Sequence, residues 1–232
     1  LRYLMTQFEY STRAPAVGTN FMASSGHPLA TSVGLQMFNE GGNAFDAAVA
    51  MAAAIAVAEP AQNHLGGDAF ALLHRSDSSE IVALNASGPA PEAAHLNLFN
   101  DTIPSHGLRS ATVPGAVAAW DLIAKTHCQL QLHQLMAPAI ELAEKGVPVT
   151  QSLHQSIVEN WSVLRNEKEW GVLFAPSGKP LQPGEILKQP ELAKTLKDIA
   201  IGGAESFYQG VFADKLNNHS NRVGGLLKAS DL

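Results

Sequence analysis

The 232-residue sequence contains a single cysteine, Cys128, and only 6% aromatic side chains. One cysteine excludes an internal disulfide and a zinc site made of several cysteines. The formal net charge is -6, and lysine and arginine do not cluster anywhere in the sequence. We therefore expect no nucleic-acid partner, because nucleic-acid binding depends on a basic patch. The histidines show no ligand spacing, and phosphate-loop and nucleophile-elbow motifs are missing, so we predict no metal and no cofactor.

Long apolar runs are also missing. The most apolar stretch, residues 44–58, is about 15 residues long, whereas a membrane-spanning helix needs about 20. We expect no membrane partner. Residues 1–9 contain no apolar run of signal-peptide length, and Met5 is a candidate start. The expected location is cytoplasmic, or periplasmic or secreted if a signal peptide has been removed.

The first quarter of the chain predicts two consecutive helices. Pro28 suits a first helical turn, where its missing N–H is no loss. Gly41 suits the left-handed position just after the end of that helix. Asn43 is a good N-cap for the next helix, and Asp46 adds a carboxylate to its first turn. Residues 44–58 are apolar almost all round, which predicts a helix buried on most sides.

Strands come early in the chain and helices follow. Residues 69–74 and 81–85 are typical of two strands joined by a polar turn, so we expect a hairpin. Helical patterns then occupy residues 114–123, 135–143, 152–167, 190–201 and 205–216. This segregation favours an α+β fold over alternating β-α units. A hydrophobic content of 46% is enough for a real core.

Several short motifs occur in a specific order: SGHPLA at 25–30, GGNAFDAA at 41–48, GGD at 66–68, VPGAV at 113–117, PAIELAEKG at 138–146 and FYQG at 207–210. Each motif alone is more often helix or turn punctuation than part of a site. Together they resemble the large-subunit part of the γ-glutamyltransferase family, which belongs to the N-terminal-nucleophile hydrolases. The resemblance implies an αββα sandwich whose sheets are completed by a small subunit. We expect residues 1–20 to be an extension and residues 21–232 to be the large-subunit portion, incomplete at its C-terminus.

The resemblance also implies a reaction, namely amide hydrolysis or acyl transfer. The family's nucleophile is a threonine that self-cleavage frees as the first residue of the small subunit, and its own α-amine serves as base. None of the threonines in this chain lies in that context, so we expect no catalytic residue here. The expected partners are the small subunit from the same precursor and a small-molecule amide substrate.

One departure from the family concerns the substrate. In the transpeptidases an arginine after the hairpin holds the α-carboxylate of the γ-glutamyl group, and Ser87 stands at that place here. Serine cannot make the two-pronged, charge-assisted contact of arginine, a loss of about 1.5–3 kcal/mol. Arg75 and Arg109 are candidates to replace it. The substrate-binding residues that we expect are Ser87, Asn85, Asp68 and His64.

Three alternatives stay open at this point. Members without the arginine resemble cephalosporin-type acylases or oxamate-type amidohydrolases, which take a different acyl group. A non-catalytic relative or a helical scaffold is the second alternative, and the first residue of the small subunit would distinguish it. The third is a serine hydrolase with Ser87 as nucleophile, for which the sequence offers no nearby base.

Overall fold

The computed structural model describes residues 15–100 and 102–232. Helices α1 (Pro28–Asn39) and α2 (Ala44–Ala58) come first, followed by the hairpin of β1 (Ala69–His74) and β2 (Ile81–Ala86). The remaining helices are α3 (Ala116–His127), α4 (Leu132–Lys145), α5 (Gln151–Leu164), α6 (Lys168–Phe174), α7 (Pro190–Tyr208) and α8 (Val211–Val223). Two short strands, β3 (Val147–Pro148) and β4 (Ile186–Leu187), pair with each other, and the short helices η1 (Leu96–Leu98) and η2 (Ala229–Asp231) lie in loops.

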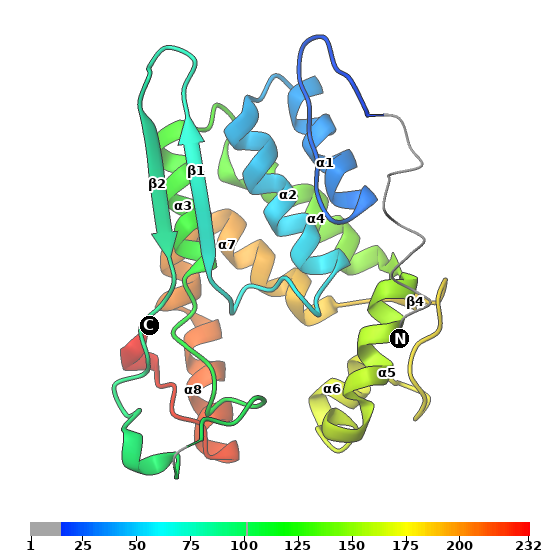
Figure 1. The fold of residues 1–232 in the computed structure, drawn as a ribbon, viewed down its shortest axis with the longest axis vertical. Helices are drawn as coiled ribbons and strands as arrows, with labels where there is room; N and C mark the ends of the chain where they lie inside the picture. The colour runs from blue at the N-terminus through cyan, green and yellow to red at the C-terminus, as the bar shows by residue number, and fades with distance from the viewer. Residues whose placement is uncertain (1–14, 101) are drawn as a thin grey trace, which may run out of the picture.

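Helices α2, α4 and α7 lie in the middle of the molecule, with the hairpin on one side and α5 and α6 on the other (Figure 1). The core forms where these helices meet, and α2 contributes the largest share of it. Its fully buried residues include Ala50, Ala53, Ala54 and Val57. Small side chains let the neighbouring helices approach closely, which confirms the prediction that α2 is enclosed on most sides.

The predicted ends of α1 and α2 are confirmed, because the residues that set them are local. The Leu29 N–H donates to His27 Nδ1 at 3.2 Å, so the histidine before Pro28 caps α1. Gly41 has φ +89°, as expected after a helix end. Asn43 Oδ1 accepts from the first turn of α2, and Asp46 Oδ2 accepts from the Asn43 N–H at 2.7 Å. These reciprocal bonds make a capping box.

Asp46 has a second role, which the sequence did not predict. Its side chain is completely buried. The backbone N–H groups of Gln129 and Leu130 both donate to its carboxylate, Leu130 at 2.8 Å. Asn43 Nδ2 also donates to the His127 carbonyl at 2.8 Å. The start of α2 is thereby fixed to the loop between α3 and α4.

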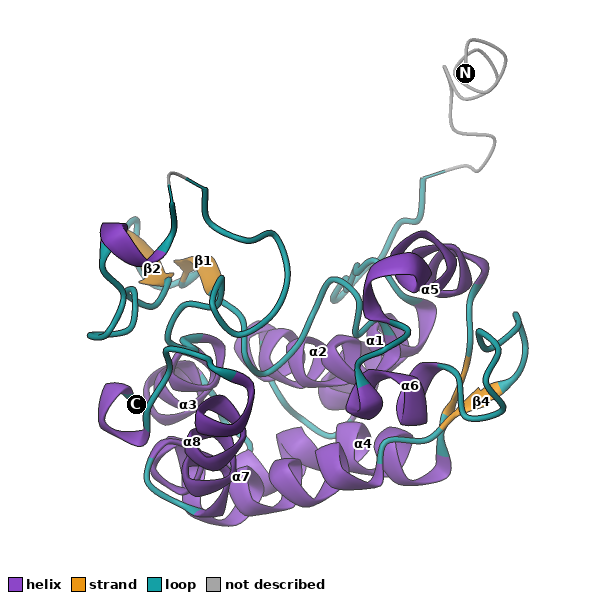
Figure 2. Cartoon of the chain, turned by 90° about the horizontal axis from the view of Figure 1, so that it is seen from below, coloured by secondary structure: helices purple, strands orange, loops and turns teal. Residues whose placement is uncertain are grey.

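The hairpin is confirmed over residues 69–86 with an antiparallel register in which Ala69 lies opposite Ala86. One face of it packs toward α3, and Leu73 and Leu84 are partly buried there. Figure 2 shows the hairpin nearly end-on, beside α3 at one side of the molecule. The other face is exposed: Phe70 is 69% accessible and Leu72 78%. Within the described residues, no third strand pairs with this sheet.

The end of the chain departs from the prediction of two helices over 190–201 and 205–216. Helix α7 continues to Tyr208 with a break at Gly203, where φ is +64° and ψ is -158°. The chain then turns at Gly210, where a Cβ would overlap the Ser206 carbonyl, so this turn requires glycine. A continuous helix over 205–216 is therefore wrong, and α8 begins only at Val211. The prediction also missed α6 and the β3–β4 pair, and α5 ends before residue 167.

The predicted extension lies mostly outside the described residues, since residues 1–14 are not among them. Residues 15–20 form no helix or strand. In the part of the chain that the structure describes, no helix is both long and apolar enough to cross a membrane.

Candidate functional site

Three of the four predicted site residues meet at the base of the hairpin. Asp68 directly precedes β1 and Ser87 directly follows β2, so the pairing of the strands places them side by side. Ser87 Oγ donates to Asp68 Oδ2 at 3.2 Å, and the Gly88 N–H donates to Asp68 Oδ1 at 3.2 Å. The Ser87 N–H donates to Asn85 Oδ1 at 2.9 Å. All three predicted side chains are exposed.

Backbone contacts hold three segments together beneath these side chains. They are residues 66–68, 86–89 and 113–116, which we call the loop junction. The Gly67 carbonyl accepts from the Gly115 N–H at 3.0 Å and from the Ala116 N–H at 2.9 Å. The Val113 N–H donates to the Pro89 carbonyl at 3.0 Å. The first turn of α3 is thus anchored on the loop that carries Asp68.

Glycine is required at two positions of the loop junction. A Cβ at Gly88 would overlap the Val113 carbonyl, and one at Gly115 would overlap the Ala86 carbonyl. The backbones therefore approach more closely than any residue with a side chain allows. The motifs GGD (66–68), SGP (87–89) and VPG (113–115) lie far apart in sequence but therefore pack together in the fold.

Tyr208 fixes the loop junction from the end of α7. Its hydroxyl donates to the Pro114 carbonyl at 3.0 Å and accepts from the Ala118 N–H at 3.1 Å. Burial raises the pKa of this phenol. The FYQG motif is evident in the sequence, but this contact is not. The signal was a polar-tipped aromatic next to a buried Phe207, since a buried tyrosine hydroxyl needs a partner.

The fourth predicted residue, His64, lies apart from Ser87. His64 and Asp68 both line a cavity of about 530 Å³ beside α2, which Trp120 also lines. We call it the Asp68 cavity. Ser87 and Asn85 instead line a neighbouring hollow of about 420 Å³ that reaches Tyr208 and Leu232. Asp68 therefore stands between the two, and the structure places His64 in the first only.

Residues 30–232 match the family model described as gamma-glutamyltranspeptidase. The chain belongs to the γ-glutamyltransferase family. It is 34% identical over 218 residues to a glutathione hydrolase-like proenzyme of Bacillus subtilis, covering 93% of this chain and 42% of that protein. It is 36% identical over 227 residues to the oxamate amidohydrolase proenzyme of Klebsiella pneumoniae, with 93% and 42% covered. The chain thus spans about two fifths of these relatives.

A solved structure that is similar to this chain confirms the fold. The cephalosporin acylase of Bacillus halodurans superposes with a TM-score of 0.86 at 34% identity, over 97% of this chain and 44% of that chain. The prediction of an α+β fold of the αββα, N-terminal-nucleophile type is therefore confirmed.

Neither candidate arginine, Arg75 or Arg109, is bonded to Ser87 in the part of the chain that the structure describes. Arg75 lies at the far end of the hairpin and pairs with Asp77 at 2.6 Å. Six strand residues at about 3.4 Å each separate it from the base by roughly 20 Å. Arg109 donates to the Leu98 carbonyl at 2.6 Å and lies over the Phe99 ring. Neither guanidinium contacts Ser87.

Ser87 also lacks the partner that a serine nucleophile needs. Its hydroxyl bonds to a carboxylate, and in residues 15–100 and 102–232 no histidine forms a hydrogen bond to it. A serine hydroxyl is a weak nucleophile unless a base such as histidine takes its proton. The geometry fits a residue that shapes a binding site rather than one that attacks the substrate.

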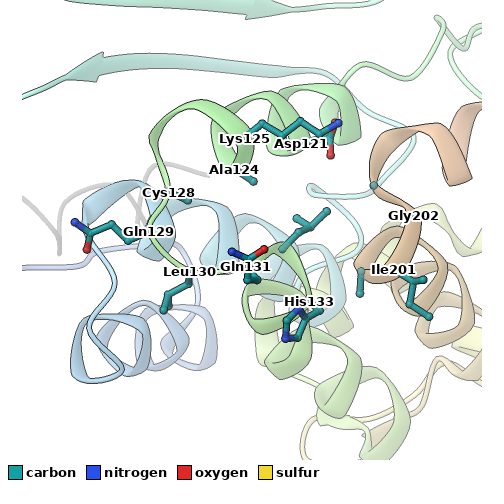
Figure 3. A pocket seen from close by; sticks show the side chains of 13 residues that line it. Asp121, Ala124, Lys125, Cys128, Gln129, Leu130, Gln131, His133, Ile201 and Gly202 are labelled. Atoms are coloured by element: carbon teal, nitrogen blue, oxygen red, sulfur yellow. The ribbon is translucent and has the colours of Figure 1, made fainter.

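Another cavity, of about 580 Å³ and separate from the two described above, lies away from the predicted site residues (Figure 3). Asp121, Lys125 and Cys128 line one side of it and Gly202 another. Asp121 is buried and pairs with Lys125 at 2.6 Å, and its Oδ1 lies against Gly203, where α7 breaks. The described residues contain no group of three or more histidine, cysteine or acidic side chains placed to hold a metal.

Proposed function

We propose that the full-length protein is an amide hydrolase or acyl transferase of the γ-glutamyltransferase type. Its nucleophile is a threonine at the start of a small subunit cleaved from the same precursor. The observation that carries the proposal is the family match over residues 30–232, together with a loop junction built from the family's own motifs. This chain supplies the large-subunit part of the fold and the wall of the substrate site, with no cofactor.

The exposed face of the hairpin supports the small subunit as partner. Phe70 and Leu72 of β1 and Ile81 of β2 lie on one face of the hairpin and are 69%, 78% and 63% accessible. Contiguous exposed apolar surface of this kind marks a contact with another element. We propose that strands from the rest of the precursor extend this sheet and cover the face, which completes the sandwich. Residues 21–232 are then the large-subunit portion.

The substrate-binding set is Ser87, Asn85, Asp68 and His64, with the first three at the base of the hairpin. Ser87 in place of the arginine supports an acyl group without an α-carboxylate. A relative is named oxamate amidohydrolase and a structural neighbour cephalosporin acylase, so the alternative is one of these two activities. A non-catalytic relative is the remaining alternative. The proposed location is cytoplasmic, or periplasmic or secreted if a leader precedes the chain.

The test is expression of the full-length precursor. Mass spectrometry should find two chains, the smaller one beginning with threonine, and the purified protein should hydrolyse simple acyl anilides. Replacing that threonine by alanine should leave one uncleaved, inactive chain. A precursor that stays intact, or a smaller chain that begins with another residue and lacks activity, would identify a non-catalytic relative.

A further inference from the structure

Asp68 carries a negative charge at the wall of the Asp68 cavity that no cation neutralises. Within the described residues, no lysine, arginine or histidine forms an ion pair with it. Its carboxylate is held at both oxygens, by the Ser87 hydroxyl and by the Gly88 N–H. Both donors are neutral, so they fix the position of the charge without cancelling it.

The other residues of the cavity wall do not neutralise the charge of Asp68. Apart from His64 and Asp68, every side chain that lines the cavity is uncharged, and Ile55 and Trp120 contribute apolar surface. Asp68 is exposed, so water screens its charge, but a unit charge about 4 Å away still interacts with it by about 1 kcal/mol in water. A bound group therefore meets an anionic wall at Asp68.

The backbone keeps Asp68 in place. Gly67 is bonded through its carbonyl to the first turn of α3, and Gly88 lies against the Val113 carbonyl. Asp68 lies between these fixed segments, and its carboxylate leaves this position only by breaking its hydrogen bonds to Ser87 and Gly88. A group held this firmly selects among ligands instead of adapting to them.

We propose that Asp68 is a specificity-determining residue of this site. The Asp68 cavity accepts an acyl group that carries an ammonium or a neutral hydrogen-bond donor, and it rejects one that carries a carboxylate at this position. The inference rests on the proposed function, because it assigns the acyl-binding wall of that same site.

The experiment compares four anilides with the assembled, full-length enzyme. Butyryl anilide carries no charged group, 4-aminobutyryl anilide adds an ammonium, glutaryl anilide adds a carboxylate, and γ-glutamyl anilide adds both. The kcat/KM values should fall in the order 4-aminobutyryl, butyryl, glutaryl. Asp68→Asn keeps a side chain of the same shape that can still bond to Ser87 and Gly88. It should raise the glutaryl-to-butyryl ratio by about fivefold or more, the factor that unit charges about 4 Å apart produce even in water.

The matched control is Asp214→Asn, which makes the same change on the exposed surface of α8. It should leave all substrate ratios unchanged. A second measurement needs no variant: added salt should raise the wild-type glutaryl-to-butyryl ratio, because it screens the charge. Ratios that change with neither Asp68→Asn nor salt would overturn the proposal while leaving the proposed function intact. If none of the four anilides is hydrolysed, the result instead contradicts the proposed function, and with it the proposed role of Asp68.

Discussion

At the scale of single residues, Ser87 and Asp68 have to be considered as a pair. Their side chains are in hydrogen-bond contact, 3.2 Å apart. An arginine placed at 87 would lie beside a carboxylate that has no other cationic partner, and the two would form a charge-assisted pair. The guanidinium introduced at position 87 would then bind the Asp68 carboxylate instead of the carboxylate of the substrate.

We therefore predict that Ser87→Arg alone improves γ-glutamyl anilide hydrolysis only slightly. Ser87→Arg combined with Asp68→Asn should raise kcat/KM for that substrate by about ten- to a hundredfold, the worth of a hydrogen bond to a charged group. Steady-state kinetics of the wild type, of the single variants Ser87→Arg and Asp68→Asn, and of the double variant gives the answer. A full gain from Ser87→Arg alone would show that Asp68 does not reach the introduced guanidinium. A wild type that already strongly prefers the γ-glutamyl compound would mean that another residue holds the α-carboxylate.

Cys128 gives a pH-dependent prediction. Burial, and then the nearby charge of Asp46, raise the pKa of this thiol to about 12. Because only the thiolate reacts, labelling of the folded protein at pH 8 should be slower than that of an unfolded thiol by about three orders of magnitude. Above pH 9 the unfolded chain loses this proton while the folded chain keeps it, so the free energy of unfolding should fall toward pH 12. Thiol-reagent kinetics with and without denaturant tests the first point, and equal rates would show that the thiol is accessible.

At the scale of elements, α2 supplies both core and cavity wall, and two adjacent alanines separate these roles. Ala53 is fully buried, whereas Ala52 lines the Asp68 cavity. Ala53→Leu should overpack the core and lower the free energy of unfolding by about 1–3 kcal/mol. Ala52→Leu should cost less because its side chain can enter the cavity, and it should reduce activity instead. Denaturant unfolding and anilide kinetics of both variants distinguish the two effects, and a loss below about 0.5 kcal/mol for Ala53→Leu would show that α2 is not enclosed.

Asp46 joins the start of α2 to the loop after α3, and its removal should be costly. Asp46→Ala leaves the N–H groups of Asn43, Gln129 and Leu130 without their acceptor in a partly buried place. At about 1–3 kcal/mol for each unsatisfied group, the loss in free energy of unfolding should be at least about 3 kcal/mol. Asp77→Ala, which removes an exposed ion pair on the hairpin turn, serves as the control and should cost less than about 1 kcal/mol. Similar losses for the two variants would contradict the structural role of Asp46.

Elements set by neighbouring residues were predictable from the sequence, and those set by distant contacts were not. Pro28, Gly41 and Asn43 determine the helix ends near them, and the hairpin follows from two apolar runs and a polar turn. The β3–β4 pair was not predictable in this way, because β3 exists only where β4, far away in sequence, lies beside it. The same division applies to the site. Strand pairing brings Ser87 and Asp68 together, whereas His64 lines a different hollow from Ser87.

At the scale of the whole molecule, the described residues leave one apolar sheet face exposed. The outer face of the hairpin is apolar and uncovered. Isolated residues 1–232 should therefore bind a hydrophobic dye and associate, whereas the assembled precursor should do neither. Dye fluorescence and sedimentation of the two samples provide the comparison. A compact monomer that unfolds in one cooperative transition would count against a sheet shared between subunits.

The loop junction has a consequence for how such a protein can change during evolution. The junction is held by main-chain atoms of three segments. At Gly88 and Gly115 these segments approach so closely that no side chain fits. The side chains of Asp68 and Ser87 bond to each other and, through Asp68, to the Gly88 N–H, but the bonds between the three backbone segments do not pass through them. Substituting both side chains, as in Ser87→Arg with Asp68→Asn, reverses the local charge while the backbone of the loop junction stays the same. A gene duplicate could therefore acquire a new substrate through two codons, long before any rearrangement of its fold.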